Sequence, residues 1–184
     1  MSGRRIEADG RSVPGPDDVA AADLTFRVVR ALAERGLTLA TAESLTGGGL
    51  TAELTRVPGA SAVVVGGAIV YATALKHTLL GVEADLLERE GPVHPEVARQ
   101  LAAGARERLA VDGRPADVGV STTGVAGPDP QGGRTVGTVY VGIASAAGVR
   151  AVELRLSGDR QAIRAQTVAR AVHELAVELG IAGR

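Results

Sequence analysis

Hydrophobic and polar positions along the chain follow two periods, one typical of helices and one typical of strands. Apolar residues recur every three to four positions in long stretches, which predicts amphipathic helices over about 17–35, 95–111 and 159–179. Continuous Val-rich and Ala-rich runs predict buried strands over 37–42, 61–71 and 118–122. Two further runs predict an antiparallel hairpin with strands over 135–145 and 149–156.

Shorter elements complete the predicted order. Short helices are expected just before Pro58, near 74–80 and over 83–90. Gly66 and Gly67 lie inside one predicted strand, where interior glycines indicate a bulge or a close backbone approach. The mixture predicts the α/β fold class, as a single-domain three-layer α/β/α sandwich with a mixed sheet.

The domain is expected to occupy residues 17–184. Residues 1–16 are rich in Arg, Gly and Pro and are expected to form a flexible N-terminal tail. This tail lacks the apolar run of a signal peptide, and no stretch of about 18 apolar residues follows it. We therefore expect a cytoplasmic protein with no membrane partner.

Composition narrows the function classes. The net charge of −1 argues against bulk electrostatic binding to nucleic acid, and the chain has only three aromatic residues on which bases could stack. The chain contains no cysteine, which excludes disulfides, thiolate metal sites and a cysteine nucleophile. Nucleic acid is therefore not an expected partner.

Lys76 is the only lysine among the 20 Lys and Arg residues of the chain. A guanidinium stays charged at any relevant pH, whereas a desolvated lysine can become neutral and act as a base. Ser44 lies in a Ser/Gly-rich turn over 42–49, so the two residues suggest a Ser–Lys nucleophile pair. The alternative interpretation is that an Arg-rich composition has left one lysine by chance.

The turn that contains Ser44 also predicts backbone donors. Thr46 is a natural helix N-cap, and the amides of Gly47 and Gly48 would then be free to stabilise an anion or an oxyanion. The alternative is an ordinary helix cap. A second turn, 122–128, also follows a strand and contains hydroxyl residues and glycines. Ligand sites in α/β folds gather at the carboxyl ends of strands.

A third candidate lies at the start of the last predicted helix. Asp159 is the expected N-cap, which puts Arg160 in the first turn, where a cation opposes the helix dipole. A bound phosphate or carboxylate would reverse that effect, and Arg164 could join Arg160 one turn later. The alternative is that Arg160 points into solvent.

Other catalytic signatures are absent from the sequence. It contains neither a GxxxxGK[ST] phosphate loop nor a GxSxG elbow. The three histidines, His77, His94 and His173, do not have the spacing of metal ligands. Neither a metal nor a cofactor is therefore expected.

Six ordered motifs together resemble the C-terminal domain of the CinA family, the competence/damage-inducible proteins. This domain is known as nicotinamide-nucleotide amidohydrolase, or NMN deamidase. The resemblance covers about Leu24 to Leu179. The motifs are Thr41-Ala42-Glu43-Ser44-Leu45-Thr46-Gly47-Gly48, Gly66-Gly67-Ala68-Ile69-Val70-Tyr71, Lys76 with Leu79-Leu80-Gly81-Val82, Thr123-Gly124-Val125-Ala126-Gly127-Pro128, Val136-Gly137-Thr138-Val139-Tyr140 and Gly158-Asp159-Arg160.

The resemblance implies hydrolysis of nicotinamide mononucleotide, a pyridine nucleotide, to nicotinate mononucleotide and ammonia. It implies Ser44 as nucleophile, Lys76 as the base, and Tyr71 and Thr123 as residues that orient groups or relay protons. It also implies a homodimer. The expected substrate-binding positions are Thr46, Gly47, Gly48, Gly124, Gly127 and Arg160, with the Gly47 and Gly48 amides as the oxyanion hole and Arg160 on the phosphate.

Two other functions remain open from the sequence. A non-catalytic nucleotide-binding or protein-interaction domain would keep the pocket without turnover. A DNA-uptake or repair accessory follows from the family name alone, and the net charge and the few aromatic residues count against it.

Overall fold

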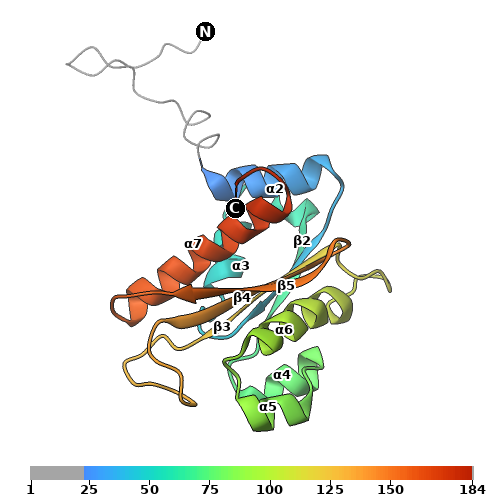
Figure 1. The fold of residues 1–184 in the computed structure, drawn as a ribbon. Coiled ribbons are helices and arrows are strands. Elements are labelled where there is room, and N and C mark those ends of the chain that lie inside the picture. The colour runs from blue at the N-terminus through green and yellow to red at the C-terminus, as the bar shows by residue number, and fades with distance from the viewer. Residues whose placement is uncertain (1–22, 184) are drawn as a thin grey trace, which may run out of the picture.

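The computed structural model describes residues 23–183 of the chain. The expected tail over 1–16 and the expected start of the first helix at residue 17 lie outside these residues. The helices are α2 (Leu24–Glu34), α3 (Gly49–Thr55), α4 (Thr73–Leu80), α5 (Ala84–Glu90), α6 (Pro95–Arg108) and α7 (Arg160–Glu178), with a short 3-10 helix, η1 (Ala60–Ala62). The strands are β1 (Leu39–Glu43), β2 (Val64–Ile69), β3 (Val118–Gly124), β4 (Thr138–Ser145) and β5 (Gly148–Arg155) (Figure 1).

The five strands form one mixed sheet in the order β2-β1-β3-β4-β5. β1 runs parallel to both β2 and β3, whereas β4 runs antiparallel to its neighbours β3 and β5. The predicted mixed sheet and the predicted hairpin are therefore confirmed. Because β1 and β3 are adjacent and parallel, their carboxyl ends bring the turns after Glu43 and Gly124 to the same edge of the sheet.

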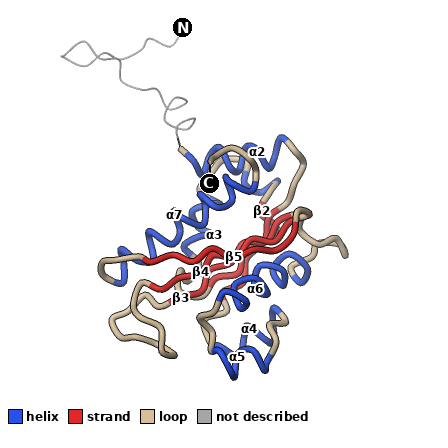
Figure 2. Tube along the Cα trace, viewed as in Figure 1, coloured by secondary structure: helices blue, strands red, loops and turns tan. Residues whose placement is uncertain are grey.

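Helices cover both faces of the sheet, which confirms the three-layer sandwich. α2, α3 and α7 lie on one face, and α6 lies on the other with α4 and α5 beyond it (Figure 2). Each face has its own buried core. Leu39, Val120 and Leu175 belong to the core under α7, whereas Ala40, Leu101 and Leu80 belong to the core under α6. No helix of residues 23–183 combines the length and apolarity needed to cross a bilayer.

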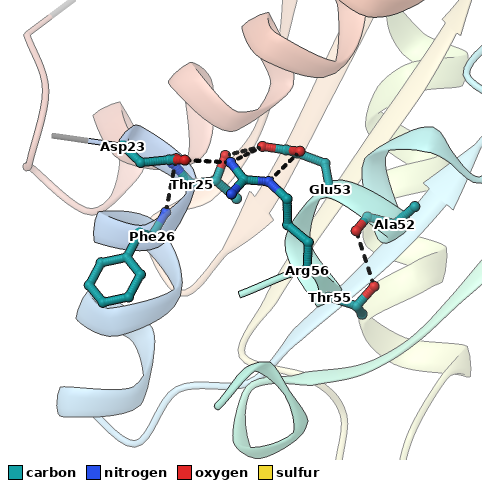
Figure 3. A network of polar contacts seen from close by, with 7 residues as sticks. All are labelled: Asp23, Thr25, Phe26, Ala52, Glu53, Thr55 and Arg56. Carbon is teal, nitrogen blue, oxygen red and sulfur yellow. Dashed lines mark hydrogen bonds and ion pairs between the residues drawn. The ribbon is translucent and has the colours of Figure 1, made fainter. Parts of the chain in front are cut away.

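The helix ends follow their local sequence. The Asp23 carboxylate accepts the backbone N–H groups of Thr25 and Phe26, which caps α2. Arg56, just past the end of α3, donates to both Asp23 and Glu53, so a polar cluster joins the start of α2 to α3 (Figure 3). The Arg56 guanidinium keeps the pKa values of the Asp23 and Glu53 carboxyl groups below their usual range.

The edge strand β2 has both a bulge and a close backbone approach, the two features that its glycines indicate. Leu39 pairs with Val64 while Ala40 pairs with Gly66, so the register of the β1–β2 pair shifts by one residue. A Cβ atom on Gly67 would lie 2.2 Å from Thr41 Oγ1, so only glycine lets the Thr41 hydroxyl approach this strand. The prediction that the strand begins at residue 61 is wrong, because Ala60–Ala62 forms a 3-10 turn, closed by the N–H of Val63 donating to Ala60.

Two strand glycines determine how closely α6 packs on the sheet. A Cβ atom on Gly142 in β4 would lie 2.1 Å from the carbonyl oxygen of Ala98, and one on Gly119 in β3 would lie 2.0 Å from that of Ala102. Both clashes are with the backbone of α6, which a rotamer change cannot relieve. The two glycines therefore set the depth at which α6 and the loop before it lie against β3 and β4.

We predict that Gly142→Ala lowers the free energy of unfolding by about 1–3 kcal/mol, because α6 must move away from the sheet. Gly66→Ala is the matched control, since Gly66 is also a strand glycine but a Cβ atom added to it would meet nothing within 4 Å. Its effect should stay within about 0.5 kcal/mol. Urea denaturation of both variants measures the difference, and equal stabilities would contradict this account of α6 packing.

Candidate active site

A cavity lies at the sheet edge where β1 and β3 end. Ser44 and Leu45 line it from the turn after β1, and Thr123 lines it from the end of β3. Lys76 reaches it from α4, and Arg160 reaches it from the first turn of α7. Four segments distant in the sequence therefore contribute polar side chains to one site.

Ser44 and Lys76 are neighbours in the lining of this cavity. The Nζ atom of Lys76 lies 3.2 Å from the Oγ atom of Ser44. The backbone N–H of Ser44 donates to the carbonyl of Thr122 at 3.0 Å, which ties the turn to the neighbouring strand. The structure therefore brings together the two residues that the sequence suggested as a nucleophile pair.

The hydrogen-bond partners of the Lys76 amine are all uncharged. Lys76 is only 1% exposed, and its Nζ atom donates to the carbonyl oxygens of Val70 at 2.6 Å and of Tyr71 at 3.4 Å. No carboxylate pairs with it among residues 23–183. Burial disfavours the ammonium form and lowers the pKa of Lys76 to about 8. A substantial fraction of this amine is therefore neutral close to physiological pH.

The glycine amides after Ser44 are not free. The N–H of Gly47 donates to the Ser44 carbonyl at 3.1 Å, and that of Gly48 donates to the Glu43 carboxylate at 2.9 Å. The prediction that these two amides are unpaired donors is therefore wrong. Thr46 is also not the helix cap, because Gly48 holds that position and the Thr46 hydroxyl pairs with the Thr122 hydroxyl at 2.8 Å. None of Thr46, Gly47 and Gly48 lines the cavity.

Other amides of the same turn are available instead. The N–H groups of Leu45 and Thr46 donate to no acceptor within the described part of the chain, and Leu45 lines the cavity. Arg164 donates to the carbonyls of Leu45 and Thr46 at 3.1 and 2.8 Å. Because a trans peptide points its N–H opposite to its C=O, Arg164 turns the N–H of Thr46 away from α7. Arg164 therefore orients this turn. The sequence had suggested that Arg164 joins Arg160 at an anion site, and its contacts with the turn do not support that role.

Glu43 is the residue at this site that sequence analysis missed. It is fully buried, and its carboxylate accepts the N–H groups of Gly48, Leu50 and Thr51 and the Thr51 hydroxyl. These are the otherwise unpaired donors of the first turn of α3, so Glu43 caps this helix from the end of the preceding strand. The sequence feature that could have identified Glu43 is a single carboxylate at the end of an apolar run.

Tyr71 and Arg160 meet at the mouth of the cavity. Arg160 donates from Nη2 to the Tyr71 hydroxyl and from Nη1 to the carbonyl of Gly127, both at 2.8 Å. Tyr71 is 57% exposed, and only its backbone carbonyl contacts Lys76. The contacts of the Tyr71 side chain therefore suit a role at the mouth rather than the proton-relay role expected from the sequence. Arg160 lines the cavity, as do Gly124 and Gly127.

Thr123 lines the cavity from the end of β3. It is fully buried by its neighbours, yet it lines the cavity. Its hydroxyl donates to the backbone carbonyl of Pro92 at 2.6 Å. Pro92 and Val93 precede α6, whose N-cap His94 accepts the N–H of Glu96 through Nδ1. Within residues 23–183, no three His, Asp or Glu side chains converge as metal ligands.

Comparison with known proteins gives a consistent result. Residues 21–179 match the family model of the CinA C-terminal domain. The chain is 43% identical over 169 residues to a CinA-like protein of Frankia casuarinae and 48% identical over 162 residues to a CinA-like protein of Thermosynechococcus vestitus. These matches cover 91% and 84% of the chain but only 38% and 37% of the two relatives. The chain thus spans less than two fifths of their length.

A solved structure has the same fold over almost its whole length. The competence/damage inducible protein CihA from Agrobacterium tumefaciens superposes with a TM-score of 0.79 at 33% sequence identity. The match covers 92% of this chain and 99% of that chain.

We predict that Glu43→Ala lowers the free energy of unfolding by about 3 kcal/mol or more, because it leaves several buried donors of α3 unpaired. Thr55→Ala is the control on the same helix, since the Thr55 side chain is exposed and donates to the backbone carbonyls of Thr51 and Ala52, the second of which Figure 3 shows. It should change stability by about 0.5 kcal/mol or less. Chemical denaturation distinguishes the two, and a mild Glu43→Ala phenotype would contradict the capping role.

Proposed function

The chain belongs to the CinA C-terminal domain family, and from this membership and the site we propose that it hydrolyses nicotinamide mononucleotide to nicotinate mononucleotide and ammonia. One observation carries the proposal. A buried lysine with no paired carboxylate in the described part of the chain lies 3.2 Å from a serine hydroxyl at the carboxyl end of a strand. An amine that loses its proton near pH 8 can activate a serine, whereas a guanidinium cannot.

The contacts of Lys76 also orient its lone pair. A neutral amine has two N–H bonds and one lone pair, and two carbonyl oxygens, those of Val70 and Tyr71, already lie within hydrogen-bond distance. When both N–H bonds point at these carbonyls, the lone pair is left for the remaining neighbour, Ser44. The amine then accepts the Ser44 proton without first having to reorganise.

The proposed reaction proceeds through an acyl-enzyme. Lys76 takes the Ser44 proton while Oγ attacks the carboxamide carbon, and the resulting oxyanion is stabilised by the unpaired amide of Leu45. The tetrahedral intermediate collapses as Lys76 returns the proton to the departing nitrogen, which leaves as ammonia. Water, deprotonated by the same amine, then attacks the carbonyl carbon of the Ser44 ester. The amine returns that proton to Ser44 Oγ as the ester bond breaks, and the carboxylate product leaves. General-base help of this kind typically contributes about 10²–10⁴-fold to the rate.

Arg160 is the proposed contact for the substrate phosphate. It is the arginine that lines the cavity, and its guanidinium already spans the mouth from Tyr71 to Gly127. A planar fork of N–H donors suits a phosphate group. The expected homodimer and cytoplasmic location remain predictions of the family resemblance and of the sequence.

A non-catalytic nucleotide-binding domain is the competing function. It would use Arg160 and the cavity walls but would not require Lys76 to become neutral. The uncharged surroundings and low pKa of Lys76 favour the amidohydrolase, because a purely binding site gains more from a charged ammonium.

We predict that purified protein releases ammonia from nicotinamide mononucleotide, and that Ser44→Ala and Lys76→Arg each lower this rate by at least about 10³-fold. Ser121→Ala is the matched control, because Ser121 is a buried serine on β3 that binds the Ala98 carbonyl and does not line the cavity. It should retain most of the activity. Full activity of Lys76→Arg would show that Lys76 is not the base, and nucleotide binding without turnover would favour the competing function.

The rate should also depend on pH through Lys76. Because the neutral amine is the active form and its pKa is about 8, kcat/KM should rise tenfold per pH unit below about pH 8 and level off above it. Ammonia release measured between about pH 6 and pH 10 tests this profile. A rate that still rises tenfold per pH unit up to about pH 10, as the ordinary lysine pKa of 10.5 would give, would contradict the desolvation of Lys76 described above.

A further inference from the structure

We propose that Thr123 is a specificity-determining residue that distinguishes the carboxamide of the substrate from the carboxylate of the product. The inference rests on the proposed function and adds to it a reason why the site accepts an amide and then releases an acid. It follows from the direction of one hydrogen bond at the wall of the cavity.

The direction of that hydrogen bond is fixed by chemistry. Thr123 Oγ1 lies 2.6 Å from the carbonyl oxygen of Pro92, and a carbonyl oxygen has no hydrogen to donate. The Thr123 hydroxyl is therefore the donor, and its single proton is committed to Pro92. What remains on Oγ1 is lone-pair density. Thr123 lines the cavity, and a ligand group that reaches its Oγ1 atom can therefore only donate a hydrogen bond to it.

Both partners of this hydrogen bond are held in place. Thr123 lies in β3, where its backbone pairs with Tyr140 of β4. Pro92 precedes Val93, which packs in a small buried cluster with Ala98 of α6. Because Ala98 also contacts the strand glycine Gly142, the loop and the strand cannot separate without moving α6. The packed core therefore fixes the direction of the hydrogen bond from the Thr123 hydroxyl to Pro92.

An acceptor at this position favours one of the two chemical groups. A carboxamide carries an –NH₂ group with two donors, whereas a carboxylate carries only acceptors. An amide nitrogen can therefore donate to Thr123, which also fixes the carbonyl oxygen on the opposite side of the reacting carbon. After hydrolysis, an anionic oxygen would face the Thr123 lone pairs. This arrangement weakens binding of the acid product. It also argues against Thr123 as a proton relay, because the hydroxyl proton is already donated to the Pro92 carbonyl.

Binding to an inactive variant tests the proposal directly. We expect Ser44→Ala protein to bind nicotinamide mononucleotide at least about tenfold more tightly than nicotinate mononucleotide, as measured by calorimetry. Adding Thr123→Val should weaken amide binding by about tenfold, because the amide donor loses its acceptor, and should leave acid binding unchanged or tighter. Adding Thr123→Ser keeps the hydroxyl and should preserve the preference for the amide.

A buried threonine elsewhere provides the control. Thr167 on α7 is fully buried and also donates to a backbone carbonyl, that of Ile163, but it does not line the cavity. Thr167→Val should therefore leave the ratio of the two affinities unchanged, even if it lowers stability as much as Thr123→Val does.

The same variants separate this inference from the function on which it rests. With Ser44 present, Thr123→Val should raise KM for the amide and leave inhibition by the acid product unchanged or stronger. An amide preference that survives Thr123→Val, or an equal loss for both ligands, overturns the role of Thr123 even when the wild-type protein is active. Absence of ammonia release by the wild-type protein contradicts the proposed function itself, and with it the assignment of Thr123 to an amide.

Discussion

The site depends on a lysine amine that is buried among backbone carbonyls and has no paired carboxylate within residues 23–183. Such an amine is costly to keep charged, and the fold tolerates it because Val70 and Tyr71 present their carbonyl oxygens where its N–H bonds need acceptors. A carboxylate in the same place would stabilise the ammonium and remove the base. The absence of a strong partner therefore preserves the reactivity of Lys76, at the expense of some folding stability at neutral pH.

The turn that carries Ser44 is held from three directions. Glu43 binds the amides of the α3 start from inside the fold, Arg164 binds two carbonyls of the turn from α7, and the Thr122 carbonyl holds the Ser44 amide from β3. These contacts leave the Leu45 and Thr46 amides as the unpaired donors of the turn. Rigid elements therefore position both the nucleophile and the groups that would stabilise charge next to it.

Much of this arrangement was predictable from the sequence, and the misses have a physical pattern. Hydrophobic periodicity located the sandwich, the mixed sheet and the hairpin, and the single lysine pointed to Ser44 as its partner. Gly47 and Gly48 were misassigned because local helix-capping rules do not reveal that the carboxylate of Glu43 turns back to bind the same helix. The roles of Arg164 and of the Tyr71 hydroxyl were missed for a related reason, since both depend on contacts between segments about 90 or more residues apart.

The bridge that Arg160 forms between Tyr71 and Gly127 has a consequence for how any anion enters the site. Two of the five N–H donors of the guanidinium are engaged before a ligand arrives, so the planar group is held at the mouth of the cavity while its other donors stay open to an anion. An anion that uses these open donors loses little affinity to side-chain ordering, because the guanidinium is already oriented. A ligand that carries a phosphate therefore meets a preorganised cation instead of a flexible one.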